Sequence, residues 1–148
     1  MPRFGAKAAW SGSIREGRGM VAFGGFEGEY SYGSRWEEKR GCSPEELLGA
    51  AHAACFSMSL AARLARVGLT PASIQTDAEV LLLPGPDFKI AQIILRVQAV
   101  VPGASDTQFA EVAEDAKTYC PVSKALAGVE DIQLHTELTE ASVADTGP

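Results

Sequence analysis

The chain has 148 residues, a mass of 15.6 kDa and a net charge of −6 at pH 7. With 46% hydrophobic residues this length predicts one domain with a real core. The acidic balance and the scattered Lys and Arg residues argue against nucleic acid and anionic membranes as partners, so we expect a small substrate. No signal-like start and no apolar run near the roughly 20 residues of a membrane span are found, which predicts a soluble cytoplasmic protein.

The first forty residues predict a β-hairpin followed by a loop. Segments 7–10 and 18–23 flank a Ser-Gly-Ser turn and a Gly-bearing loop, as the two strands of a hairpin would. In residues 24–40, Gly, aromatic and charged residues follow one another without a sustained period, which predicts a loop with at most one short strand. Binding groups often lie on such loops.

Residues 41–68 predict one long helix with defined ends. Ser43 can cap it, Pro44 suits the first helical position, and Glu46 completes a Ser-x-x-Glu capping box. The closing glycine can end the helix in a left-handed conformation. Three- and four-residue spacing predicts an apolar face made of Leu47, Leu48, Ala51, Cys55, Met58, Ala62 and Ala65. This face would carry a thiol, that of Cys55.

Two long strands should follow the helix. Segments 73–82 and 88–101 are rich in Ile, Val and Leu and alternate in part. A Leu-Pro-Gly-Pro-Asp turn cluster separates them, which is typical of an antiparallel pair.

The last third of the chain predicts two helices and a final strand. Ser105 or Asp106 can cap a helix that runs to about residue 117, and Pro121 suits the first position of a short helix. Residues 132–138 alternate like a strand, and residues 141–148 read as a small, polar, disordered tail. This order of elements indicates an α+β fold with the long helix packed on a sheet.

The cysteine and histidine residues argue against a disulfide framework and against a metal site. Three cysteines are too few and too dispersed for a framework, and there is no Cys-x-x-Cys motif. His52 and His135 lie far apart in sequence. We therefore expect no metal site.

Two cysteines nevertheless suggest redox chemistry. A lone Cys on an apolar helix face, such as Cys55, is usually a small buried hydrophobe. Cys120, however, stands at a predicted helix N-terminus, where unpaired N–H groups and the helix dipole stabilise a thiolate. The two thiols could meet as an attacking and a resolving group, although their sequence spacing does not by itself bring them together.

The run GCSPEELLGAAHAACFSM at 41–58, with the later Cys120-Pro-Val-Ser, closely resembles the OsmC/Ohr family of osmotically inducible and organic hydroperoxide resistance proteins. The resemblance covers nearly the whole chain, and the wording of the helix resembles the OsmC branch. It implies an OsmC-like α+β fold with one domain over residues 1–140 and a long central helix on antiparallel sheet. It further implies an intertwined homodimer with active sites near the subunit interface.

For function, the resemblance implies a thiol-dependent peroxidase that uses no haem or metal. The substrates would be organic hydroperoxides and, less efficiently, hydrogen peroxide. An external dithiol of lipoyl type, free or on a protein, would act as reductant, although the residues alone do not exclude thioredoxin. Organic peroxides would be favoured if apolar side chains line the pocket, such as Phe56, Met58 and the loop aromatics Phe26, Tyr30, Tyr32 and Trp36.

Carried over to this sequence, the resemblance makes Cys55 the peroxidatic thiol and Cys120 the resolving thiol. Arg35 would be the catalytic cation, and Glu45 the carboxylate that holds it. A guanidinium stays charged in a partly apolar pocket and raises the reactive thiolate fraction. Since ten residues separate Glu45 from Cys55, about 15 Å along a helix, a long Arg side chain would have to link them.

Each of these assignments has a plainer alternative. Glu45 in the first turn of a helix is favourable for the helix dipole alone. Arg15, Arg18 and Arg40 also lie in or near loops and could serve in place of Arg35.

Three further residues are not expected to take part in the chemistry. His52, three residues before Cys55, could be its base, but a structural role is preferred. His135 is expected to be ordinary. Cys42 departs from the family pattern and is taken as incidental, although it could form a competing disulfide.

Two other functions remain open on the sequence alone. A stress-related small-ligand-binding dimer with the same fold and inert thiols predicts slow reaction of Cys55 with peroxide and with alkylating reagents. A purely structural dimer predicts no Arg or carboxylate close to either sulfur.

Overall fold

The computed structural model describes residues 1–140, so the predicted disordered tail at 141–148 lies outside the described residues. The chain divides into two compact units, residues 1–47 and residues 48–148, and each is described by itself. One domain over residues 1–140 therefore stays a prediction.

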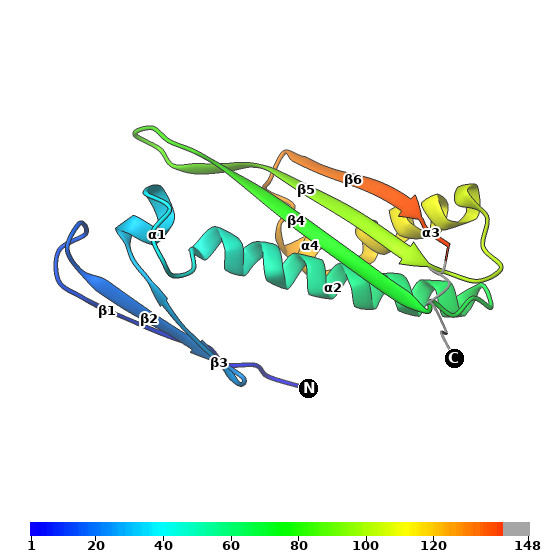
Figure 1. The fold of residues 1–148 in the computed structure, drawn as a ribbon, viewed down its shortest axis with the longest axis horizontal. Coiled ribbons are helices and arrows are strands. Elements are labelled where there is room, and N and C mark those ends of the chain that lie inside the picture. Colours follow the sequence, from blue (N-terminus) through cyan, green and yellow to red (C-terminus); the bar gives the residue numbers. More distant parts are fainter. Residues whose placement is uncertain (141–148) are drawn as a thin grey trace, which may run out of the picture. The chain divides into compact units, whose positions relative to one another are not determined.

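The first unit contains a three-stranded antiparallel sheet, as Figure 1 shows. Its strands are β1 (Lys7–Ser11), β2 (Arg18–Phe23) and β3 (Phe26–Tyr30), and β2 lies in the middle. The opening hairpin is thereby confirmed. A Gly24-Gly25 turn joins β2 to β3, and Gly24 has a φ of 53°, which a side chain would disfavour.

For residues 24–40 the sequence pattern predicts a loop with at most one short strand; the strand is present as β3, whereas helix α1 (Tyr32–Trp36) was not predicted. The Ser31 hydroxyl accepts a hydrogen bond from the Ser34 N–H at 3.0 Å, and the Ser34 hydroxyl accepts one from the Ser31 N–H at 2.8 Å. Two serines thus make the reciprocal capping contact that usually needs Glu or Gln. A single five-residue turn has no period to detect, which explains the error.

Helix α2 (Pro44–Arg66) is the predicted long helix, and its predicted capping box is present. The Ser43 N–H donates to a Glu46 carboxylate oxygen at 2.7 Å, and the Glu46 N–H donates to the Ser43 hydroxyl at 3.1 Å. Gly68 follows with a φ of 77°, as expected for a glycine that ends a helix. The helix therefore begins and ends where its sequence predicts.

The second unit has a three-stranded mixed sheet with β5 in the middle. Strands β4 (Ser73–Leu83) and β5 (Lys89–Val100) pair antiparallel, as predicted. Strand β6 (Asp131–Leu138) pairs with β5 in parallel, a direction that its alternating pattern does not reveal. Exposed and half-buried residues alternate along β4, so one face of the sheet is covered and the other faces solvent.

The parallel pairing requires a crossover from β5 to β6, and two helices provide it. Helix α3 (Asp106–Tyr119) begins at Ser105, whose hydroxyl accepts the Gln108 N–H at 3.2 Å. Helix α4 (Pro121–Ala125) begins directly after it, with Pro121 at its first position. Cys120 is the single residue between the two helices, so it lies at a sharp corner of the chain.

One apolar core joins α2 and α3 to the sheet. Figure 1 shows α2 beside the sheet that contains β4 and β5. Every core residue is less than one tenth exposed: Phe56, Leu60, Leu64, Ile93, Leu95, Val97, Ala99, Val101, Phe109, Val112, Ala113, Ala116 and Cys120.

The buried face of α2 differs from the predicted one. Phe56, Leu60 and Leu64 are fully buried together with His52, whereas Met58 is 75% exposed. Alanine and other small residues occur on every side of α2, so the spacing of apolar residues does not by itself identify the buried face. The large side chains determine which face packs on the core. The residues left on the outer face of α2 are Ala51, Ala54, Met58, Ala62 and Ala65. Cys55 is half-buried at the edge between the two faces.

Within residues 1–140, α2 is the one helix long and apolar enough to cross a membrane by length and composition. From the sequence pattern, no apolar run of membrane-spanning length was expected. The criterion is weak evidence, since a long helix that packs in a core meets it too, and α2 buries Phe56, Leu60 and Leu64 in the core of the folded chain.

Candidate active site

The second unit brings together the two cysteines whose sequence spacing leaves the pairing open. The thiols of Cys55 on α2 and Cys120 at the α3–α4 corner lie close enough to influence each other's ionisation. Both cysteines are free. The Cys120 side chain makes no capping hydrogen bond to α4, and it is completely buried. The two cysteines are therefore neighbours in the second unit.

A backbone group also contacts the attacking candidate. The amide of Val122 hydrogen-bonds the Cys55 thiol. Val122 is the second residue of α4, where backbone N–H groups have no partner within the helix. Val122 was not among the predicted site residues, although Pro121 at the first helical position indicates that the next backbone N–H has no partner within the helix.

The surroundings of Cys55 within its own unit favour the protonated thiol. Burial raises the pKa of Cys55, and the neighbouring Cys120 raises it further, while the Val122 amide lowers it. The net pKa is above the ordinary thiol value, so this unit alone keeps Cys55 largely protonated at neutral pH. A thiolate at neutral pH needs a further positive charge.

Arg35 and Glu45 form an ion pair in the first unit. The Arg35 Nε lies 3.1 Å from both carboxylate oxygens of Glu45, and its Nη2 donates to Oε1. The Arg35 side chain is 33% exposed and that of Glu45 11%. The guanidinium carbon also lies 5.5 Å from the centroid of the Trp36 ring. Glu45 thus orients the guanidinium in a two-point contact.

The other arginines named as alternatives have different surroundings. The Arg15 guanidinium lies over the Tyr32 ring, 4.7 Å from its centroid. Arg18 and Arg40 line a cavity of about 270 Å³ with Lys39 and other residues of the first unit. Arg35 is the candidate that the structure places on Glu45, as the resemblance implies.

His52 is completely buried, and its Nε2 lies 2.7 Å from the Ser123 hydroxyl of α4. Its Nδ1 has no hydrogen-bond partner among residues 1–140, so the ring makes no hydrogen bond to the Cys55 sulfur. Burial lowers the pKa of His52, and the nearby Lys117 lowers it further. A neutral ring that contacts α4 fits the structural role preferred in the sequence analysis better than the role of base.

The remaining candidates have surroundings that do not make them part of the thiol pair. The Cys42 thiol donates to the Glu29 carbonyl at 3.4 Å within the first unit. His135 is exposed on β6. Phe56 is buried in the core and does not line an open pocket. Residues 1–140 contain no group of three or more His, Cys, Asp or Glu side chains that could hold a metal ion.

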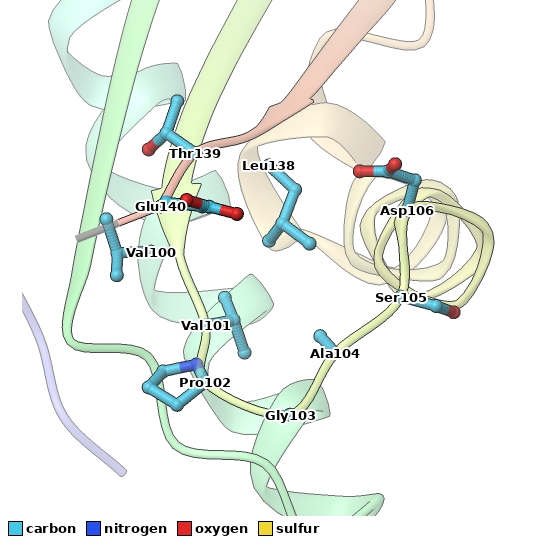
Figure 2. Close-up of a pocket in the computed structure, with 10 residues that line it drawn as sticks. All are labelled: Val100, Val101, Pro102, Gly103, Ala104, Ser105, Asp106, Leu138, Thr139 and Glu140. Atoms are coloured by element: carbon cyan, nitrogen blue, oxygen red, sulfur yellow. The ribbon is translucent and has the colours of Figure 1, made fainter. Parts of the chain in front are cut away.

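A cavity of about 630 Å³ lies at the end of the sheet of the second unit. Figure 2 shows Leu138 and Glu140 on one side of it and Ser105 and Asp106 on the other. None of Arg35, Glu45, Cys55 and Cys120 lines this cavity.

The second unit is thus an α+β arrangement, with a long helix packed on a mixed sheet and two free cysteines that are neighbours in space. This is the arrangement of a thiol-containing α+β protein. The family model described as OsmC-like protein matches residues 37–136. The chain belongs to the OsmC-like family.

Two curated relatives show where the chain lies within this family. It is 43% identical to peroxiredoxin OsmC of Escherichia coli over 124 residues, which cover 81% of this chain and 87% of that protein. It is 29% identical to organic hydroperoxide resistance protein-like 1 of Staphylococcus epidermidis over 99 residues, 66% of this chain and 71% of that protein. The predicted resemblance to the OsmC branch is confirmed.

Solved structures confirm the fold class. An OsmC-like protein from Mycoplasma pneumoniae superposes with a TM-score of 0.73 at 16% identity, over 95% of this chain and 99% of that one. The organic hydroperoxide resistance protein OhrB of Bacillus subtilis gives a TM-score of 0.69 at 23% identity, over 92% and 98%. At these identities the likeness concerns the fold.

Proposed function

We propose that this protein reduces organic hydroperoxides, and less efficiently hydrogen peroxide, to alcohols or water through Cys55. The names of its relatives, peroxiredoxin OsmC and organic hydroperoxide resistance protein-like 1, support a role in peroxide reduction or resistance. The observation that carries the proposal is the contact between the Cys55 and Cys120 thiols. It supplies both an attacking and a resolving sulfur, without a prosthetic group.

In the proposed reaction the Cys55 thiolate attacks the distal oxygen of the hydroperoxide. The O–O bond breaks, the alkoxide takes a proton to leave as an alcohol, and the sulfur becomes a sulfenic acid. The Cys120 thiol then displaces hydroxide from the sulfenic sulfur, so that water leaves and a Cys55–Cys120 disulfide forms. Two electrons have passed from the two thiols to the peroxide.

An external dithiol would return the enzyme to its reduced form by thiol–disulfide exchange, and we propose a lipoyl-type dithiol, free or protein-bound. Each cycle transfers two electrons and two protons from it to the disulfide. The three free cysteines fit a reducing compartment, so the proposed location is the cytoplasm.

Arg35 is proposed to stabilise the Cys55 thiolate, with Glu45 orienting its guanidinium. Two observations support this role: the two-point contact between Arg35 and Glu45, and the raised pKa of Cys55, which leaves a need for a nearby cation. A fixed guanidinium beside the sulfur would lower that pKa and raise the thiolate fraction at neutral pH.

The functional unit is proposed to be a homodimer. The outer face of α2 presents small and apolar side chains to solvent, and such a face is typical of a helix that packs on a partner. Sedimentation equilibrium should give twice the chain mass of 15.6 kDa. Met58→Asp, which places a charge on this face, should shift the mass toward the monomer, whereas Thr70→Asp in an exposed loop should not. A wild-type monomer would contradict the dimer.

A second candidate is a small-ligand-binding dimer with inert thiols. The raised pKa of Cys55 favours it, because a protonated thiol reacts slowly. This candidate predicts that reduced protein leaves peroxide unconsumed and that Cys55 resists alkylation at neutral pH.

Anaerobic titration of the reduced protein separates the two functions. Cumene hydroperoxide and hydrogen peroxide are added in separate series, and mass mapping identifies the oxidised cysteines. We expect one equivalent of cumene hydroperoxide to form a Cys55–Cys120 disulfide, faster than hydrogen peroxide does. The same result with Cys42→Ser excludes disulfides of the third cysteine. If both thiols stay reduced, or only Cys42 is oxidised, the peroxidase proposal is wrong.

A further inference from the structure

Three polar side chains on one side of α2 contact the corner between α3 and α4. His52 bonds Ser123, Cys55 contacts Val122 and Cys120, and Ser59 donates to the Ala116 carbonyl at 3.1 Å. Their spacing of three and four residues places these α2 residues in one row along the helix. The corner that carries the resolving thiol is therefore fixed to α2 by a row of polar contacts.

The burial of His52 is expected to lower the stability of the fold. It is completely buried, and its Nδ1 has no partner among the described residues. Its neighbours along the buried face, Phe56, Leu60 and Leu64, are all apolar. A buried polar atom without a hydrogen bond costs about 1–3 kcal/mol, so packing alone would favour an apolar side chain here. The one polar contact that His52 makes is the bond to Ser123.

Apart from the packing of Val122 and Leu126 against the core, helix α4 makes few contacts that would fix its position. It is five residues long, none of its residues is fully buried, and the Cys120 side chain does not cap it. A helix of this length is not stable by itself and depends on tertiary contacts. Ser123 immediately follows Val122, whose amide contacts the Cys55 sulfur. A bond that fixes Ser123 also fixes the amide beside it.

We propose that His52 is a positioning residue: its bond to Ser123 holds α4 so that the Val122 amide stays on the Cys55 sulfur and Cys120 stays within reach. This inference rests on the proposed role of Cys55 as the attacking thiol. The titratable group that faces Cys55 in its unit is Cys120, and the one that faces His52 is Lys117.

Ser123→Ala, made in a Cys42→Ser background, tests the proposal. The pH dependence of Cys55 alkylation by iodoacetamide is followed by mass mapping, and the thermal unfolding midpoint is measured alongside. Losing one hydrogen bond to the thiolate should slow alkylation at pH 7 about threefold to tenfold and move the profile to higher pH. Ser123→Thr, which keeps the hydroxyl, should restore the original profile.

Ser57→Ala is the matched control, because the Ser57 hydroxyl makes a side-chain bond of the same 2.7 Å length from α2 to Thr76 on β4. It should lower the unfolding midpoint and leave the alkylation profile in place. His52→Gln, which tests the other end of the bond, should move the profile as Ser123→Ala does, and the double variant should add little. A Ser123→Ala profile that stays at the original position, even with lowered stability, overturns the proposal.

Alkylation uses no peroxide, which keeps the two proposals apart. If the protein fails to consume peroxide, the peroxidase function falls while the alkylation profiles still report on the His52–Ser123 bond. If peroxide is consumed but Ser123→Ala behaves like Ser57→Ala, only the positioning role falls.

Discussion

Cys55→Ser should lower the rate of cumene hydroperoxide reduction by on the order of a thousandfold or more, because the reaction loses its nucleophile. A serine hydroxyl stays protonated at neutral pH and cannot replace the thiolate as nucleophile. Peroxide consumption in the presence of a dithiol reductant, followed by a colorimetric hydroperoxide assay, measures the loss. Cys42→Ser is the matched control, since it removes a thiol of the first unit, and it should keep the full rate. Normal turnover by Cys55→Ser would refute the central assignment.

Cys120→Ser completes this test by separating attack from resolution. It should consume about one equivalent of peroxide at nearly the normal rate and then stop, because the sulfenic acid on Cys55 has no partner. Trapping with dimedone should label Cys55 in this variant and much less in the wild type. A Cys120→Ser variant that turns over with an ordinary dithiol at the full rate would show that resolution does not need Cys120.

Arg35→Gln should lower the peroxide rate at pH 7 about tenfold to a hundredfold by raising the pKa of Cys55, a shift of one to two units. The sign follows from the charge: the thiolate is the reactive form, and burial together with Cys120 already raises this pKa. Removing a cation raises it further, so the rate profile moves to higher pH. The deficit should shrink as pH rises, since both proteins approach full ionisation. Rates from pH 5 to 10 measure this shift.

Arg15→Gln provides the matched control for Arg35→Gln. Arg15 also stacks on an aromatic ring in the first unit, that of Tyr32, but it is not the arginine that pairs with Glu45. Its pH profile should match that of the wild type. Equal profiles for the two glutamine variants would remove Arg35 from the proposed site.

Local signals predicted much of this fold because their physical causes are local. The Ser43–Glu46 capping box, the proline that opens α4 and the turn between β4 and β5 each depend on a few neighbouring residues. Where a structural feature depends on contacts between residues far apart in the chain, the sequence pattern gave no prediction or a wrong one. The direction of β6 is set by the crossover, and the inward face of α2 is set by which large side chains fit the sheet.

The candidate site divides in the same way. Family resemblance named Cys55, Cys120, Arg35 and Glu45, and the structure places the first two in contact and the last two in an ion pair. Neither contact could be predicted from spacing, because each joins different secondary-structure elements. The His52–Ser123 bond joins residues far apart in the chain and has no sequence signal of its own.

The parallel pairing of β5 and β6 has a consequence for how the chain folds. Cys120 belongs to the crossover, so it reaches Cys55 only after the segment between Val100 and Asp131 has folded back over the sheet. Pairings that close such long connections form slowly, because the loop-closure entropy must be overcome before the contacts form. We therefore expect the two sulfurs to come together only once the crossover helices have packed on α2, so that the pairing of Cys55 with Cys120 belongs to the folded unit and not to the newly made chain.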